Sequence, residues 1–216
     1  MKKLLSLIVA MAMFMGPMTT VSYALEEAPD EGFVQVEVTG TSPTVKVFEN
    51  PETGEMYATF DTNHFEVGDD IILYNDSETG MQVGVKVVST EPKPTTRASD
   101  DTGWGAGSIP SGYHTLEPHI DYWGVSISYM LDVSAYPVVF EDAYNDVISG
   151  PVLTIEEADL YIRQAEPNSS ADPASAILDF QLTIEQCGVV AESTTGYLEY
   201  MMNPDGNARM RWAWNL

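Results

Sequence analysis

The last twenty residues, Tyr197 to Leu216, constrain the fold of this chain more than any other stretch. At their centre is Asn203-Pro204-Asp205-Gly206, in which Pro204 fixes φ at the second position and Gly206 supplies a positive φ. This is the pattern of a type I turn followed by a G1 bulge, and it predicts a β-hairpin. The turn sets Tyr200 opposite Met210, Glu199 opposite Arg211 and Leu198 opposite Trp212.

Side chains alternate across a strand, so this register sorts the hairpin into two faces. One face is apolar and predicts a core: Leu198, Tyr200, Met202, Ala208, Met210, Trp212 and Trp214. The other carries Tyr197, Glu199, Met201, Arg209 and Arg211, and we expect its arginines to face water. The hairpin therefore predicts the closing strands of a β-sandwich with its tryptophans inside.

Alternating apolar residues predict about nine or ten short strands in all and no long helix. The clearest ranges are 33–38, 44–48, 55–60, 71–74, 81–88, 113–116, 124–133, 137–140 and 177–185. Thr154 to Gln164 fits either a capped helix or a strand, and its surroundings favour a strand. We predict an all-β protein, an antiparallel β-sandwich built of hairpins.

Composition divides the chain into five parts. Residues 1–24 resemble a signal peptide, with Lys2-Lys3, an apolar run from Leu4 to Met15, and Ser22-Tyr23-Ala24 before a cleavage site after Ala24. We then expect a flexible acidic extension at 25–32 and a β-hairpin region at 33–90. The hairpin region either joins the sandwich or forms a small N-terminal β-subdomain. A linker or long loop at 91–108 and a C-terminal β-sandwich region at 109–216 follow.

Export and charge narrow the class of protein. The apolar run is shorter than the ~20 residues that span a bilayer, so we expect a secreted protein with no membrane span in the mature chain. The single cysteine, Cys187, allows no internal disulfide, which favours a Gram-positive bacterial origin. The net charge of −24 argues against nucleic acid and anionic lipid as partners.

Two groups of residues could bind a metal ion. His114, Glu117 and His119 surround Pro118, which breaks the helix that a zinc-enzyme motif requires, so a looser site competes with ordinary loop residues. Two acidic groups could bind calcium, which is the one cofactor that the sequence suggests. The alternative is that they are solvated loop acids. They are Asp100 and Asp101, and Glu141 and Asp142 with Asp146.

Catalytic motifs are missing from the sequence. There is no Gly-x-Ser-x-Gly nucleophile elbow, and Cys187 follows a predicted strand with no helix N-terminus to activate it. Carboxylates are numerous enough that a glycosidase pair could be proposed, but composition does not select one. The sequence leaves open whether the protein is an enzyme, and it favours a protein without catalytic activity.

Four aromatic residues near glycine-rich turns are the best binding candidates: Trp104, Tyr113, Tyr122 and Trp123. Exposed aromatic rings on a β-sandwich can stack on sugars or anchor a protein partner. The alternative is that Tyr113 and Trp123 plug an open end of the core.

The order of features from Phe60 onward is similar to an uncharacterised domain-of-unknown-function family of secreted proteins from Gram-positive gut bacteria. The shared features are the hairpin from Ile71 to Val88, a polar linker, Ile109-Pro110-Ser111-Gly112, and Gly124-Val125-Ser126 leading into Met130-Leu131-Asp132-Val133. The resemblance implies an exported β-rich domain and carries no catalytic residues.

Together these features predict an exported, non-enzymatic β-sandwich that acts outside the cell as a binding or interaction module for a glycan or a protein. A secreted glycan-active hydrolase and a calcium-stabilised cell-surface protein are the two alternatives.

Overall fold

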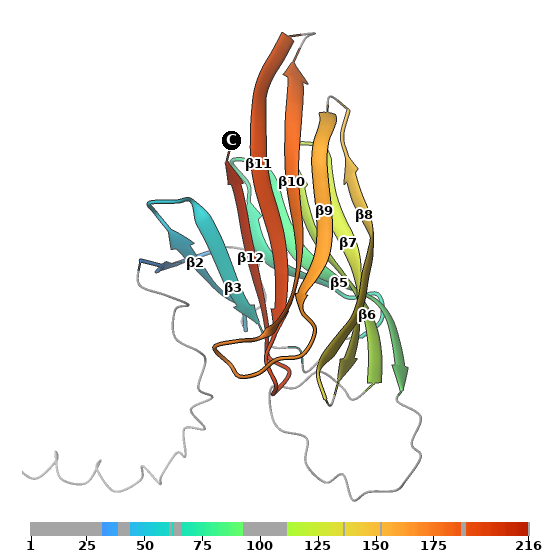
Figure 1. Ribbon diagram of the computed structural model, residues 1–216. Coiled ribbons are helices and arrows are strands. Elements are labelled where there is room, and N and C mark those ends of the chain that lie inside the picture. Colours follow the sequence, from blue (N-terminus) through green and yellow to red (C-terminus); the bar gives the residue numbers. More distant parts are fainter. Residues whose placement is uncertain are drawn as a thin grey trace, which may run out of the picture.

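The structure is a computed structural model, and it describes residues 32–38, 44–60, 62, 66–92, 112–135, 137–151, 153–186 and 189–215. These ranges form an all-β fold of two antiparallel sheets packed face to face, which confirms the predicted sandwich (Figure 1). No element in these ranges is a helix long and apolar enough to cross a membrane.

The seven-stranded sheet has the order β1-β2-β3-β12-β11-β10-β9, and the five-stranded sheet the order β4-β5-β6-β7-β8. The strands are β1 (Val34–Val36), β2 (Lys46–Asn50), β3 (Glu55–Phe60), β4 (Asp70–Asp76), β5 (Met81–Pro92), β6 (Gly112–Tyr122), β7 (Val125–Ala135), β8 (Val139–Ser149), β9 (Leu153–Gln164), β10 (Ala174–Gln186), β11 (Val189–Met202) and β12 (Ala208–Asn215). Because β3 pairs with β12 and β5 pairs with β6, residues 34–92 contribute strands to both sheets.

The C-terminal hairpin has the predicted register. Leu198 pairs with Trp212, Glu199 with Arg211, and Tyr200 with Met210. The Gly206 amide donates to the Asn203 carbonyl at 3.0 Å, and Gly206 has φ +82°, as the turn chemistry requires. Its strand β12 lies between β3 and β11, so the hairpin joins the first strands of the chain to the last ones.

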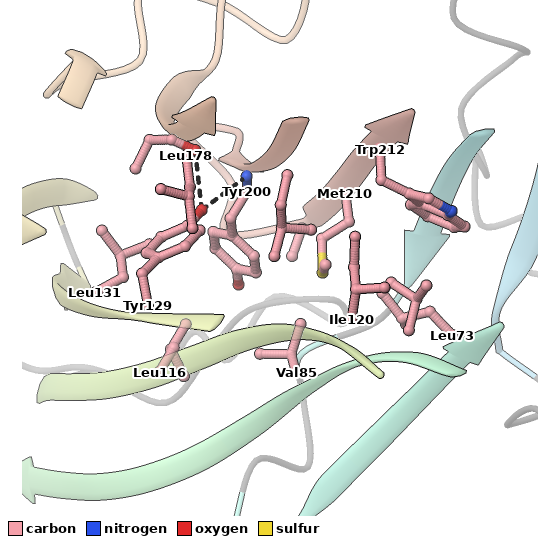
Figure 2. Close-up of a cluster of buried hydrophobic side chains, with 14 of the residues drawn as sticks. Leu73, Val85, Leu116, Ile120, Tyr129, Leu131, Leu178, Tyr200, Met210 and Trp212 are labelled. Atoms are coloured by element: carbon pink, nitrogen blue, oxygen red, sulfur yellow. Dashed lines mark hydrogen bonds between the residues drawn. The ribbon is translucent and has the colours of Figure 1, made fainter. Parts of the chain in front are cut away.

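The core lies between the sheets and follows the strand alternation (Figure 2). The residues of β7 that alternate toward the other sheet are all buried: Val125, Ile127, Tyr129, Leu131 and Val133. From the other sheet, Leu178, Tyr200, Met210 and Trp212 point toward them. The Tyr129 hydroxyl donates to the Ala176 carbonyl at 2.9 Å and accepts the Tyr200 amide at 3.2 Å, so a side chain of one sheet is bonded to the backbone of the other.

Strand β6 is longer than the predicted strand at 113–116 because it continues through Pro118. Proline lacks the amide that a sheet ladder uses, so an interior proline normally argues against a strand. Here the pairing of β6 with β7 has no partners at Glu117 and Pro118 and resumes at His119 in the same register. A gap in the ladder therefore accommodates the proline.

The outer face of the C-terminal hairpin differs from the prediction. The expectation that the arginines face water is wrong for Arg209, whose residue is only 8% exposed. Its Nη2 donates to the Ser170 carbonyl at 2.9 Å, and the β9–β10 loop crosses the lower ends of β11 and β12 (Figure 1). The neighbouring Glu199 has a side chain only 4% exposed, with its carboxylate 3.7 Å from Arg211 and 3.6 Å from Arg163.

Residues 153–164 form the edge strand β9, which confirms the strand interpretation over the helix. Its pairing with β10 shifts register at two places, and its exposed face carries Glu156, Glu157 and Asp159. Register shifts and charges interrupt the flat row of free backbone groups that another edge strand could join.

Candidate functional site

Strands β6 and β7 are joined by a turn of two residues, Trp123 and Gly124, at one end of the sandwich. Tyr122 pairs with Val125, and the two turn residues have φ +50° and +81°. Two positive φ values are the signature of a type I′ turn, which matches the twist of the flanking strands and prefers Asn-Gly or Gly-Gly. A tryptophan at the first position is thus a departure from the usual turn chemistry.

Trp123 is also the most exposed of the large apolar side chains in the described ranges, at 74%. An L-residue in the left-handed region costs roughly 1–2 kcal/mol, and exposure forgoes the burial that usually stabilises a tryptophan. The turn requires a positive φ at this position, but it does not require a tryptophan there. Strain of this kind is a reason to look for a function at the residue.

Two other turns lie beside Trp123. A Cβ atom added to Gly80, in the β4–β5 turn, would lie 3.9 Å from Cδ1 and Nε1 of the Trp123 ring. A Cβ atom added to Gly124 would lie 3.9 Å from Pro151, in the β8–β9 turn at the upper end of Figure 1. Because Gly80 has no side chain, the indole lies close to the backbone of this turn at that position. We call this end of the sandwich the Trp123 tip.

A chain of polar side chains runs from the Trp123 tip along the outer face of the five-stranded sheet. The Ser126 hydroxyl donates to Asp121 Oδ1, Asp121 Oδ2 lies 3.1 Å from His119 Nδ1, and His119 Nε2 lies 3.0 Å from Asp70 Oδ1. We call these four residues the Asp70–Ser126 chain.

Gly84 on β5 makes room for this chain. It pairs with His119, and a Cβ atom added to Gly84 would lie 2.8 Å from His119 Nε2 and 2.9 Å from the Ile71 carbonyl oxygen. The His119 side chain is 12% exposed, whereas the side chains of Asp70 and Asp121 are each 47% exposed. The imidazole is therefore fixed between two carboxylates that remain open to a ligand.

The structure separates the predicted aromatic candidates. Tyr113 is 42% exposed but begins β6, at the opposite end of that strand from Trp123. Tyr122 points inward, with its ring centroid 5.2 Å from that of Trp214. Trp104 lies outside the described residues. The exposure of Tyr113 and Trp123 does not fit the alternative in which they plug the core.

The predicted metal ligands are also separated. His114 is buried and faces the core, where its register partner is Val133, whereas Glu117 and His119 lie on the outer face of the same strand. Glu141, Asp142 and Asp146 are exposed on β8, and Asp100 and Asp101 lie outside the described residues. Within the described ranges, no three His, Cys, Asp or Glu side chains are grouped as ligands for one ion.

Sequence reasoning missed Asp70, Asp121 and Ser126. The alternation of Glu117, His119 and Asp121 along one strand could have shown that these side chains share a face. Asp70 comes from β4, so only the pairing of β4, β5 and β6 brings it to His119.

Comparison with protein-family models, with curated proteins and with solved structures found no match to this chain.

Proposed function

We propose that this protein is exported, is cleaved after Ala24, and acts outside the cell as a non-enzymatic binding module whose contact surface is the Trp123 tip. The observation that carries the proposal is the exposed indole of Trp123 held at φ +50°. Asparagine at this position would suit the turn better and would remove an exposed apolar surface. A residue that is unfavourable in both respects is best explained by a contact with a partner.

The sequence supports the export part of the proposal. The basic residues Lys2 and Lys3, the apolar run and the Ser22-Tyr23-Ala24 site follow the order of a signal peptide. Mass spectrometry of the protein recovered from culture medium tests it. A mature chain beginning at Leu25 supports export, and an uncleaved chain retained in the cells contradicts it.

A glycan-active hydrolase is less well supported by this geometry. Asp70 and Asp121 are the two carboxylates of the Asp70–Ser126 chain, but the His119 ring lies between them and is hydrogen-bonded to both. A retaining or inverting pair needs that space for the sugar or a water molecule. The calcium-stabilised alternative predicts a lower melting temperature in chelator, and an unchanged temperature would argue against it.

The binding proposal is tested with three forms of the purified mature protein, residues 25–216: wild type, Trp123→Asn and Tyr113→Asn. Each is labelled and added to bacterial cell envelopes and to mucus-type glycoprotein. We expect Trp123→Asn to lose at least about tenfold in binding while its melting temperature stays equal or rises, since Asn-Gly is a preferred type I′ pair. Tyr113→Asn removes an exposed aromatic ring at the far end of β6 and controls for nonspecific apolar contact.

Equal binding by wild type and Trp123→Asn would place the contact surface elsewhere. Equal losses in Trp123→Asn and Tyr113→Asn would mean that the binding is nonspecific. Either result contradicts the proposal.

A further inference from the structure

We infer that the ligand of the Trp123 tip is a polysaccharide of hexose rings without acidic groups, which extends from Trp123 along the Asp70–Ser126 chain. This inference rests on the proposed function and names its ligand class. It follows from the chemistry of the side chains that continue from the indole.

The indole supplies the apolar part of such a site. One face of a hexose ring presents C–H groups and stacks on a flat aromatic surface, and indole is the largest such surface in proteins. Trp123 is 74% exposed, and its neighbour Gly80 projects no side chain that would obstruct a ring laid against the indole.

The Asp70–Ser126 chain supplies the polar part. Each carboxylate oxygen can accept two hydrogen bonds. Asp121 uses one position on Oδ1 for Ser126 and one on Oδ2 for His119, so both oxygens keep a position for a sugar hydroxyl. The His119 and Ser126 contacts hold the Asp121 carboxylate in one orientation, which lowers the entropy lost when a ligand is bound.

The spacing fits a polymer better than a single sugar. His119 lies four positions before Trp123, and at ~3.3 Å per residue these four steps cover about 13 Å, which is longer than one hexose ring. Ser128, the register partner of His119, donates to Glu117 at 3.1 Å, so hydrogen-bonding groups continue past His119 along the outer face.

The negative charge of the protein excludes polysaccharides that carry acidic groups. The chain has a net charge of −24, and the acidic side chains of this surface include Asp70 and Asp121 of the polar chain and the exposed Glu78 of the β4–β5 turn. Uronic acid polymers and sulfated polymers would meet like charge here. A protein partner fits less well, because a protein hot spot lies within a surrounding surface that excludes water. The residues of the Asp70–Ser126 chain instead offer a sugar mostly hydrogen-bonding groups.

The test uses immobilised polysaccharides as probes: unsubstituted glucans, mannans and galactans, with a polyuronate as the acidic arm. We expect wild type to bind at least one neutral polymer and not the polyuronate. Trp123→Asn should lose at least about tenfold in affinity, and Asp121→Ala should lose about tenfold through its hydroxyl contacts. Tyr113→Asn should bind as wild type.

Gly84→Ala is a second probe of the chain. It introduces a Cβ atom at the place of the His119–Asp70 contact, and we expect a several-fold loss of affinity. Melting curves separate a lost contact from a lost fold. If Asp121→Ala and Gly84→Ala both melt like wild type and both bind neutral polymers as well as wild type does, the extended site is overturned.

A second arm separates this inference from the proposed function. Envelope or mucus material that binds the protein in a Trp123-dependent way is treated with periodate, which cleaves vicinal diols, or with protease. Binding that disappears with periodate and survives protease supports the inference. Binding that survives periodate and disappears with protease overturns it, while the Trp123 tip remains a binding surface. Binding that never depends on Trp123 contradicts the proposed function itself.

Discussion

Tyr129 and Tyr200 pack side by side in the core, and their hydroxyl groups have opposite environments (Figure 2). The Tyr129 hydroxyl bonds to the Ala176 carbonyl and the Tyr200 amide, at 2.9 and 3.2 Å. The buried Tyr200 hydroxyl has no hydrogen-bond partner among the described residues. Burial raises the pKa of both phenols, so both stay neutral.

Removing the Tyr129 hydroxyl should destabilise the protein. Tyr129→Phe leaves a buried carbonyl and a buried amide without the group that bridges the sheets, which costs about 1–3 kcal/mol. Urea denaturation of wild type and variant measures the change in the free energy of unfolding. An unchanged value would mean that the bridge contributes nothing to stability.

Removing the Tyr200 hydroxyl should change the free energy of unfolding in the opposite direction. Tyr200→Phe deletes a polar group that burial separates from water, so we expect the free energy of unfolding to stay equal or to rise by up to about 1 kcal/mol. The two variants are matched controls, since each loses one oxygen atom from a buried ring. A loss in Tyr200→Phe as large as in Tyr129→Phe would contradict the difference between the two sites.

The Glu199 carboxylate makes stability depend on pH in a defined direction. Burial raises the pKa of Glu199 above its ordinary value of 4.5, although Arg211 and Arg163 act in the opposite direction. The folded state therefore holds this proton more tightly than the unfolded state. The contribution of Glu199 is fully present below pH 4.5 and is lost as the pH rises through the folded pKa.

Comparison with Glu199→Gln isolates this effect, because glutamine does not titrate and other groups cancel in the difference. We expect the stability of wild type relative to Glu199→Gln to fall as the pH rises from 4 toward 7, at roughly constant ionic strength. A relative stability that grows with pH would show that the two arginines outweigh the burial.

Gly196 allows two aromatic rings to meet across β11. It pairs with Phe180 on one side and Trp214 on the other, and those rings contact edge-to-face at a centroid distance of 5.7 Å. A Cβ atom at Gly196 would lie 2.5 Å from Phe180 Cζ and 2.6 Å from the Ala213 carbonyl oxygen. We expect Gly196→Ala to lower the free energy of unfolding by about 1–3 kcal/mol.

A double variant checks the cause of this loss. Phe180→Leu removes the far end of the ring, so the loss in Phe180→Leu/Gly196→Ala should be smaller than the sum of the two single losses. Additive losses in thermal or chemical denaturation would show that the clash with Phe180 is not responsible.

Features of the fold that are set by residues close together in the sequence could be predicted from the sequence. The Asn203-Pro204-Asp205-Gly206 turn fixes the register of its hairpin, and the alternation of apolar residues over 124–133 identifies the buried face of β7. The prediction ended β8 near Phe140, because its remaining residues are largely polar and exposed, as suits an edge strand.

Contacts between distant segments could not be read from the sequence. The burial of Arg209 depends on a carbonyl of the β9–β10 loop, and the Asp70–His119 contact depends on which strands pair. Trp123 was a predicted binding residue, but its exposure and left-handed backbone became visible only with the turn in place.

The position of β12 between β3 and β11 also bears on when this protein can fold. Until residues 208–212 are available, β3 and β11 each lack a neighbour, and the larger sheet remains in two halves. Contacts between segments so far apart in the chain form slowly, since a long loop must close first. The larger sheet of this protein can therefore be completed only after residues 208–212 have been synthesised.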